Sequence, residues 1–320
     1  APYFLQAIEL DPEFSEAYLL LSDNYAHEMV NLAQIAARAT EGAETGFDEE
    51  AFIAARSEHS RLLELAEETA PDNVRAAVAR ANRILFSDDW SRAPTVLSLI
   101  VREGNCIEDN YVSSFLLMAP PSQRTVDFRA RQVACDPLNP VAWTSYEDAL
   151  FAAEQFETLT AIMQQRNERR IFDSDPSRRA FREVRTLFAL REFDEVERRI
   201  QGPSLDGPTR TFLMLQLEAL RGNRESATRY AEDMLALPRL PTPYRATIHA
   251  MLGDRESANE WATLADDQPL SPLRFHSAVT TCMCGAPFDL DATPNLAARY
   301  REAGFPWPPP NDLEFPLKDW

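Results

Sequence analysis

The stretch from Phe4 to Tyr25, FLQAIELDPEFSEAYLLLSDNY, contains the end of one predicted helix and the start of the next. Phe4 and Ala7 are three residues apart, which places them on one helical face. Asp11-Pro12 ends this first helix, because proline disfavours the helical conformation in the residue before it. The face of a second helix follows at offsets of 3, 1 and 3: Tyr18, Leu21, Ser22 and Tyr25.

The same junction recurs further along the chain, after Asp136-Pro137. Its equivalent positions hold Trp143, Tyr146, Glu147 and Leu150. Glu147 stands where the first junction has a small residue, so close packing of the two helices is in doubt there. A second internal repeat places Gly-Asn-Arg-Glu-Ser-Ala at 222–227 and Gly-Asp-Arg-Glu-Ser-Ala at 253–258, 31 residues later. In both copies the Gly should end one helix and the Ala should begin the buried face of the next.

These junctions resemble those of tetratricopeptide (TPR) repeats, which place a Phe and an Ala late in one helix, then a Pro, then a large aromatic residue. The resemblance covers about residues 2 to 267. It implies an all-α chain folded as a right-handed α-solenoid of about seven or eight TPR-like helical hairpins. The chain is also similar to the C-terminal helical region of bacterial regulators that carry a winged-helix or cyclase domain at the N-terminus.

We expect three parts: an N-terminal TPR-like segment (1–72), TPR-like helical repeats (73–267), and C-terminal capping helices with a Pro-rich tail (268–320). The first segment has an unusually long hairpin, with helices from about Glu13 to Ala39 and Asp48 to Thr69, around a break from Thr40 to Gly46. The chain begins inside what resembles a second TPR helix, so we expect it to be part of a longer protein. The tail, Phe305 to Trp320, should fold back and cap the last hairpin; the alternative is a polyproline ligand.

The composition restricts the classes of function. The net charge is −19, which disfavours direct binding to nucleic acid phosphates. No apolar run approaches the roughly 18 residues of a membrane span. Basic residues are almost all Arg, with Lys318 the single Lys, which suggests a bacterial genome rich in GC. We expect a cytoplasmic chain, or a periplasmic one if a membrane helix precedes it.

The cysteines, Cys106, Cys135, Cys282 and Cys284, are too few for a disulfide framework and lack the CxxC spacing. His276, Cys282 and Cys284 are metal ligands by residue type, but their spacing matches no zinc module. We therefore expect buried thiols, no metal and no cofactor. The sequence contains no Walker, Rossmann, HExxH or G-x-S-x-G motif, and we expect no enzyme activity and no catalytic residues.

The candidate binding site is an arginine-rich segment, in which Arg178, Arg182 and Arg185 share one helical face. In an acidic chain this face could bind an acidic partner segment or a carboxylate ligand through bidentate contacts. The alternative is a solvated surface that also includes Arg166, Arg169, Arg170 and Arg179. There the arginines would pair with nearby acids such as Asp173, Asp175 and Glu183.

The sequence thus predicts a non-catalytic protein-interaction scaffold in a bacterial multidomain protein. Its concave groove would bind a partner protein or peptide, which could be acidic. The alternative is the ligand-sensing domain of a regulator, with a small molecule bound between hairpins.

Overall fold

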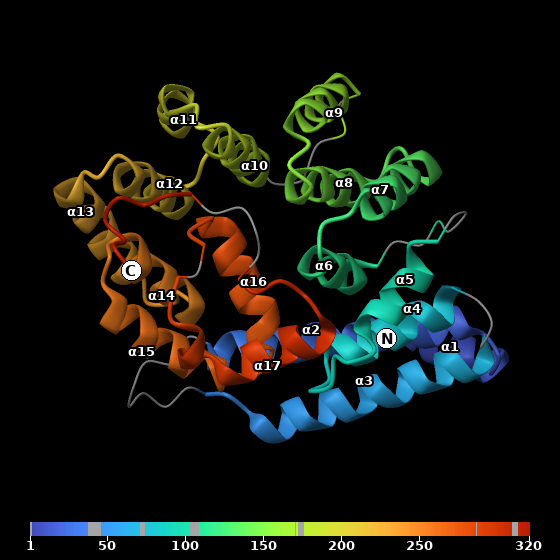
Figure 1. Ribbon diagram of the computed structural model, residues 1–320. Coiled ribbons are helices and arrows are strands. Elements are labelled where there is room, and N and C mark those ends of the chain that lie inside the picture. The colour runs from blue at the N-terminus through green and yellow to red at the C-terminus, as the bar shows by residue number, and fades with distance from the viewer. Residues whose placement is uncertain are drawn as a thin grey trace. The chain divides into compact units, whose positions relative to one another are not determined.

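The computed structural model describes most of the chain: residues 2–37, 46–70, 74–102, 106, 109–169, 171, 176–285, 287–308 and 313–320. Seventeen α-helices and one 3-10 helix lie within these residues, and consecutive helices pack in pairs (Figure 1). The prediction of an all-α fold is therefore confirmed. The expected break at Thr40 to Gly46 lies outside the described residues except for its last position, and Arg170, Asp173 and Asp175 lie outside them entirely.

The chain divides into two compact units, each built from more than one stretch of sequence. Unit 1 comprises Ala1–Cys135, Gln268–Leu270 and Ala298–Pro306, and unit 2 comprises Asp136–Asp267, Ser271–Ala297 and Trp307–Trp320. The sequence-based division at residues 72 and 267 stays a prediction.

The helices of unit 1 that precede the first boundary are α1 (Pro2–Leu10), α2 (Ser15–Ala36), α3 (Glu49–Thr69), α4 (Val74–Leu85), α5 (Ala93–Ile100), α6 (Asn110–Met118) and α7 (Gln123–Cys135). Unit 2 then contains α8 (Pro140–Ala152), α9 (Phe156–Glu168), α10 (Pro176–Ala189), α11 (Phe193–Ile200), α12 (Gly207–Leu220), α13 (Arg224–Leu235), α14 (Thr242–Met251), α15 (Arg255–Asp266), α16 (Ser271–Cys282) and the 3-10 helix η1 (Leu290–Ala292). The division between the units falls within α17 (Pro294–Ala303).

The two predicted junctions make the same polar contact. In unit 1 the Tyr18 hydroxyl donates a hydrogen bond to the carbonyl of Pro12 (3.1 Å). In unit 2 the indole N–H of Trp143 donates to the carbonyl of Pro137 (3.0 Å). Both aromatic rings are buried, and each ties its helix to the Asp-Pro turn six residues earlier. The equivalence of these positions is therefore structural as well as sequential.

The core of unit 1 has two parts. Along the long α2–α3 pair, Tyr18 and Leu21 pack with Leu62 and Leu63, so the predicted long hairpin is present. Beyond it, the fully buried Trp90 packs edge-on against Phe115 (5.0 Å between ring centres), close to Tyr300 and Phe305. Full burial of each large apolar side chain contributes about 1.5–3 kcal/mol.

In unit 2 the repeated glycine motif forms two matching hairpins, α12–α13 and α14–α15 (Figure 1). Gly222 and Gly253 have φ of +71° and +77°, a conformation that favours glycine. Each therefore ends its helix as predicted. Ala227 and Ala258, five residues later, are fully buried, which confirms their predicted place on the core face.

The C-terminal segment, residues 313–320, folds back on unit 2. Its Phe315 is buried, and the backbone N–H of Leu313 donates to the carbonyl of Met283 (2.6 Å). Pro316 contacts the turn at Gly222, and the Leu317 carbonyl lies directly against Gly253. The segment thus covers the turns of both repeated hairpins.

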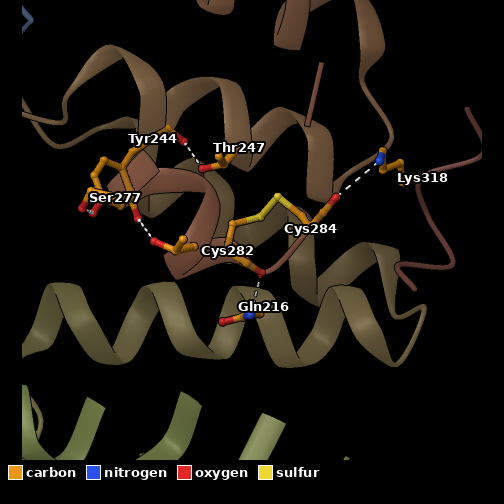
Figure 2. Close-up of a disulfide and its surroundings, with 8 residues drawn as sticks. Gln216, Tyr244, Thr247, Ser277, Cys282, Cys284 and Lys318 are labelled. Carbon is orange, nitrogen blue, oxygen red and sulfur yellow. Dashed lines mark hydrogen bonds between the residues drawn. A yellow bond between two sulfur atoms is a disulfide. The ribbon is translucent and has the colours of Figure 1, made fainter. Parts of the chain in front are cut away.

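The cysteines differ from the expectation of thiols. Cys106 is joined to Cys135, and Cys282 to Cys284. Figure 2 shows the second disulfide at the end of α16. There Gln216 of α12 donates to the carbonyl of Cys282 (2.8 Å), and Lys318 donates to that of Cys284 (3.3 Å). The prediction of buried thiols, which was based on the spacing of the cysteines in the sequence, is therefore wrong.

Among the described residues, no helix is both long enough and apolar enough to span a membrane.

Candidate functional site: a pocket in unit 2

Unit 2 contains a pocket of about 790 Å³ bordered by α8, α10, α12, α13, α14 and α16. Known small-molecule sites have volumes of roughly 300–1,000 Å³. Most of its surface is apolar, contributed by Phe181, Phe212, Met234, Leu237, Leu240 and Tyr244. Phe212, Met234 and Leu240 are buried, so this part of the pocket is rigidly packed from behind.

Six charged side chains also line the pocket: Arg178, Arg182, Arg185, Arg239, Asp148 and Asp206. The first three are the arginines singled out by the sequence. They lie on α10 with helical spacing, and all three line this one pocket. Arg239 comes from the segment between α13 and α14, which the sequence did not link to them.

Arg182 is held by a buried charge network. Its Nε donates to Glu147 Oε2 (3.1 Å), and the same carboxylate accepts from Arg166 Nη1 (2.9 Å). Burial raises the pKa of the Glu147 carboxyl, while the charges of Arg166 and Arg182 oppose that shift. Glu147 thus fills the small-residue position with a carboxylate that ties α8 to α9 and α10. Ion pairs therefore join the helices at the position where close packing was in doubt.

Arg185 is fixed on two sides. Its Nη2 donates to Asp148 Oδ1 (2.8 Å), and its guanidinium lies 4.1 Å from the centre of the Phe151 ring. On α16, burial and the charge of Arg185 lower the pKa of His276 to about 4, so this imidazole is neutral at pH 7. Arg185 is therefore a preorganised cation.

Of the three acids expected to pair with these arginines, only Glu183 lies among the described residues, so the pairing with Asp173 and Asp175 stays a prediction. Glu183 instead pairs with Arg199 (3.2 Å), whereas Arg182 and Arg185 reach back to acids on α8. Arg166 is buried in the network, and Arg169 lies over the Trp143 ring (5.6 Å). The arginine-rich segment is thus divided between structural contacts and pocket lining.

Asp206, the other carboxylate in the lining, caps α12. It accepts from the backbone N–H of Thr209 (2.7 Å) and from the Ser177 hydroxyl (3.2 Å). Burial raises the pKa of this carboxyl, but these hydrogen bonds and Arg210 outweigh burial and leave the pKa below its usual 3.8. Asp206 is therefore ionised at neutral pH and committed to the helix end.

No metal site is evident in the part of the chain that the structure describes, where no three His, Cys, Asp or Glu side chains cluster suitably. Cys282 and Cys284, two of the ligands considered from sequence, are bonded to each other.

Compared with known proteins, the chain matches no family model, and no curated protein is significantly similar to it.

Proposed function

We propose that this chain is a non-catalytic ligand-sensing module that binds a small molecule in the pocket of unit 2. One observation carries the proposal: a pocket of about 790 Å³ in unit 2, with a mostly apolar surface, that is lined by residues from several hairpins and also by arginines and carboxylates. Cavities of this kind are the usual sites for small molecules. A ligand that contacts several hairpins favours the arrangement in which those contacts form, and so reports its presence to the rest of the chain.

The finer architecture that goes with this function is a right-handed solenoid of TPR-like hairpins, as in an effector domain of a bacterial regulator. Its support is the pairwise packing of consecutive helices, together with the two matching glycine-ended hairpins. Stacked repeats contact mainly their neighbours, so a ligand between hairpins acts directly on the curvature of the stack.

The second candidate function is a scaffold that binds an acidic protein segment. Its support is the exposure of Arg178 and Arg239 at the pocket. We favour the small molecule because Arg182 and Arg185 expose only 13% and 15% of their side chains. A broad partner surface would reach them poorly.

A neutral fluorescent probe, N-phenyl-1-naphthylamine, tests the ligand-sensing proposal, because its emission rises in apolar pockets. We expect saturable binding by the wild type and loss of binding when Leu237→Trp fills the pocket. The matched control is Leu264→Trp on α15, an exposed leucine that is not part of the pocket lining. Equal probe binding by both variants, or no binding by the folded wild type, contradicts the proposal.

The scaffold candidate needs a different variant. Reversing Arg182 or Arg185 would set a carboxylate against Glu147 or Asp148 and disturb the fold. Arg178→Glu avoids those ion pairs. A purified acidic peptide that binds wild type without displacing the neutral probe, and that is lost from this variant, would favour the scaffold.

A further inference from the structure

The charges at the pocket run against those of the chain as a whole. The chain carries a net charge of −19, yet four arginines and two carboxylates line this pocket. Positive side chains therefore outnumber negative ones in the lining of this pocket, although the chain as a whole is acidic.

The two carboxylates are already engaged by the protein. Asp148 accepts from Arg185 (2.8 Å), and Asp206 caps α12 through the Thr209 N–H (2.7 Å). A cationic ligand would have to compete with these bonds and approach four guanidinium groups. The two carboxylates therefore offer little to a cationic ligand.

The four arginines differ in their exposure. Arg182 and Arg185 are anchored from α8 by Glu147 and Asp148, so their positions cost little entropy when a ligand binds. Arg178 and Arg239 are exposed and come from different elements, α10 and the segment before α14. An anionic group at the mouth could contact both, since guanidinium groups bind carboxylates in pairs of parallel hydrogen bonds.

We propose that the pocket selects an organic anion with an extended apolar body: Arg178 and Arg239 bind the anionic group, and the surface around Phe212 and Met234 takes the apolar part. The inference rests on the proposed ligand-sensing function and adds the chemical class of the ligand. Cationic and neutral analogues carry no group that can pair with the arginines, and this difference gives the pocket its specificity for an anion.

Displacement of N-phenyl-1-naphthylamine by octanoate, octanol and octylamine tests this class, because the three compounds share one apolar chain and differ in charge. We expect octanoate to displace the probe at a concentration about tenfold lower than octanol, as for a charge-assisted hydrogen bond. Octylamine should be the weakest. The differences in displacing concentration among the three compounds should become smaller as salt is added.

The matched variants are Arg178→Gln/Arg239→Gln at the pocket and Arg198→Gln/Arg229→Gln on exposed positions outside its lining. Both remove the same charge, so a general field effect would appear in both. We expect only the first pair to abolish the preference for octanoate while the neutral probe still binds. Equal displacement by all three compounds, or a preference that survives in the first pair, overturns the anion class. Absence of any probe binding by wild type would instead remove the ligand-sensing function itself.

Discussion

The hairpins α12–α13 and α14–α15 share one motif but have different surroundings. In each, a glycine with positive φ ends the first helix, and the next residue caps the second. Asn223 accepts from the Ser226 N–H (3.4 Å), and Asp254 accepts from the Ser257 N–H (3.2 Å). The local sequence therefore fixes the turn in the same way twice.

The two hairpins differ in the chemical type of the cap residue and of its polar partner. Asn223 donates its amide to Glu218 (2.7 Å), whereas Asp254 contacts the His249 ring (3.0 Å). The partner lies five residues before the cap in both cases. An amide paired with an acid has thus been exchanged for an acid paired with an imidazole, at the same two positions.

The hairpins also differ in what covers them. Arg224 of the first donates to the carbonyl of Leu252, in the next hairpin (3.1 Å). Its equivalent, Arg255, binds Asp289 through two nitrogens (2.8 and 3.0 Å) and lies over the ring of Trp320 (5.6 Å). The arginine of the internal hairpin thus contacts the next repeat, while the arginine of the last hairpin contacts non-repeat segments.

Substitution of the two glycines should give the largest difference in stability between the hairpins. Gly222→Ala should cost about 1 kcal/mol, for a left-handed alanine, since the nearest atom of Pro316 leaves ordinary space. Gly253→Ala should cost that amount plus about 1–3 kcal/mol, because the new methyl group would overlap the Leu317 carbonyl. Urea unfolding of both variants measures the difference. Removing residues 313–320 should erase the additional cost at Gly253; an additional cost that persists would contradict the overlap.

The caps should have the next largest effect. Asn223→Ala and Asp254→Ala each remove an acceptor from a helix start, which costs about 1 kcal/mol. Each also leaves its partner, Glu218 or His249, without this contact. Amide exchange at Ser226 and Ser257 would locate the loss, and we expect each substitution to increase exchange in its own hairpin. Global destabilisation without a local increase would speak against the capping role.

The reversed polar pairs predict opposite responses to pH. Burial raises the pKa of Asp254, but its bonds with Ser257 and His249 outweigh burial and hold the pKa below 3.8. Its contribution to stability is therefore present above about pH 4 and is lost as the pH falls through the lower folded pKa. The stability advantage of wild type over Asp254→Asn should shrink in that acidic range.

The counterpart is Asn223→Asp, which places a second carboxylate beside Glu218. Like charges disfavour ionisation, so this variant should be least stable near neutral pH and recover on acidification. The same residue type thus gives pH dependences of opposite sign in the two hairpins. The free energy of unfolding could instead change with pH in the same direction in both hairpins between pH 3 and 7. That result would show that the partner five residues before the cap does not determine the pH dependence.

Substitution of Arg224 or Arg255 should give the smallest difference in stability between the two hairpins, because both side chains are exposed. Arg255→Ala should destabilise more than Arg224→Ala at low salt, since it loses a two-nitrogen ion pair and an aromatic contact. The gap should narrow in high salt, where surface charges are screened. Thermal melts in low and high salt measure it, and an unchanged gap would assign the effect to the Trp320 stacking.

Local patterns predicted the helices well. The helix expected from about Asp48 to Thr69 ends at the residue where α3 ends, and Gly222 and Gly253 follow the ends of α12 and α14 as expected. Such boundaries depend on proline, glycine and caps within a few residues, which the sequence displays directly. The Tyr18 and Trp143 equivalence was visible for the same reason.

The pocket was only partly visible. Arg178, Arg182 and Arg185 stood out because one helix spaces them regularly. Arg239 and Phe212, from other hairpins, have no local pattern that links them to α10. Nor does any local rule pair Arg182 with Glu147, 35 residues earlier. The disulfides were missed because pairing depends on distance in the fold and not on spacing along the chain.

The fixed five-residue link between each cap and its partner also defines what can be exchanged when repeats recombine. A crossover at the glycines would join Glu218 to Asp254, or His249 to Asn223, and mismatch both pairs. A crossover placed before Glu218 and before His249 keeps each pair together. The transferable segment of this chain therefore begins inside the last turns of the first helix of each hairpin. Grafted or duplicated hairpins should be cut there rather than at the turn.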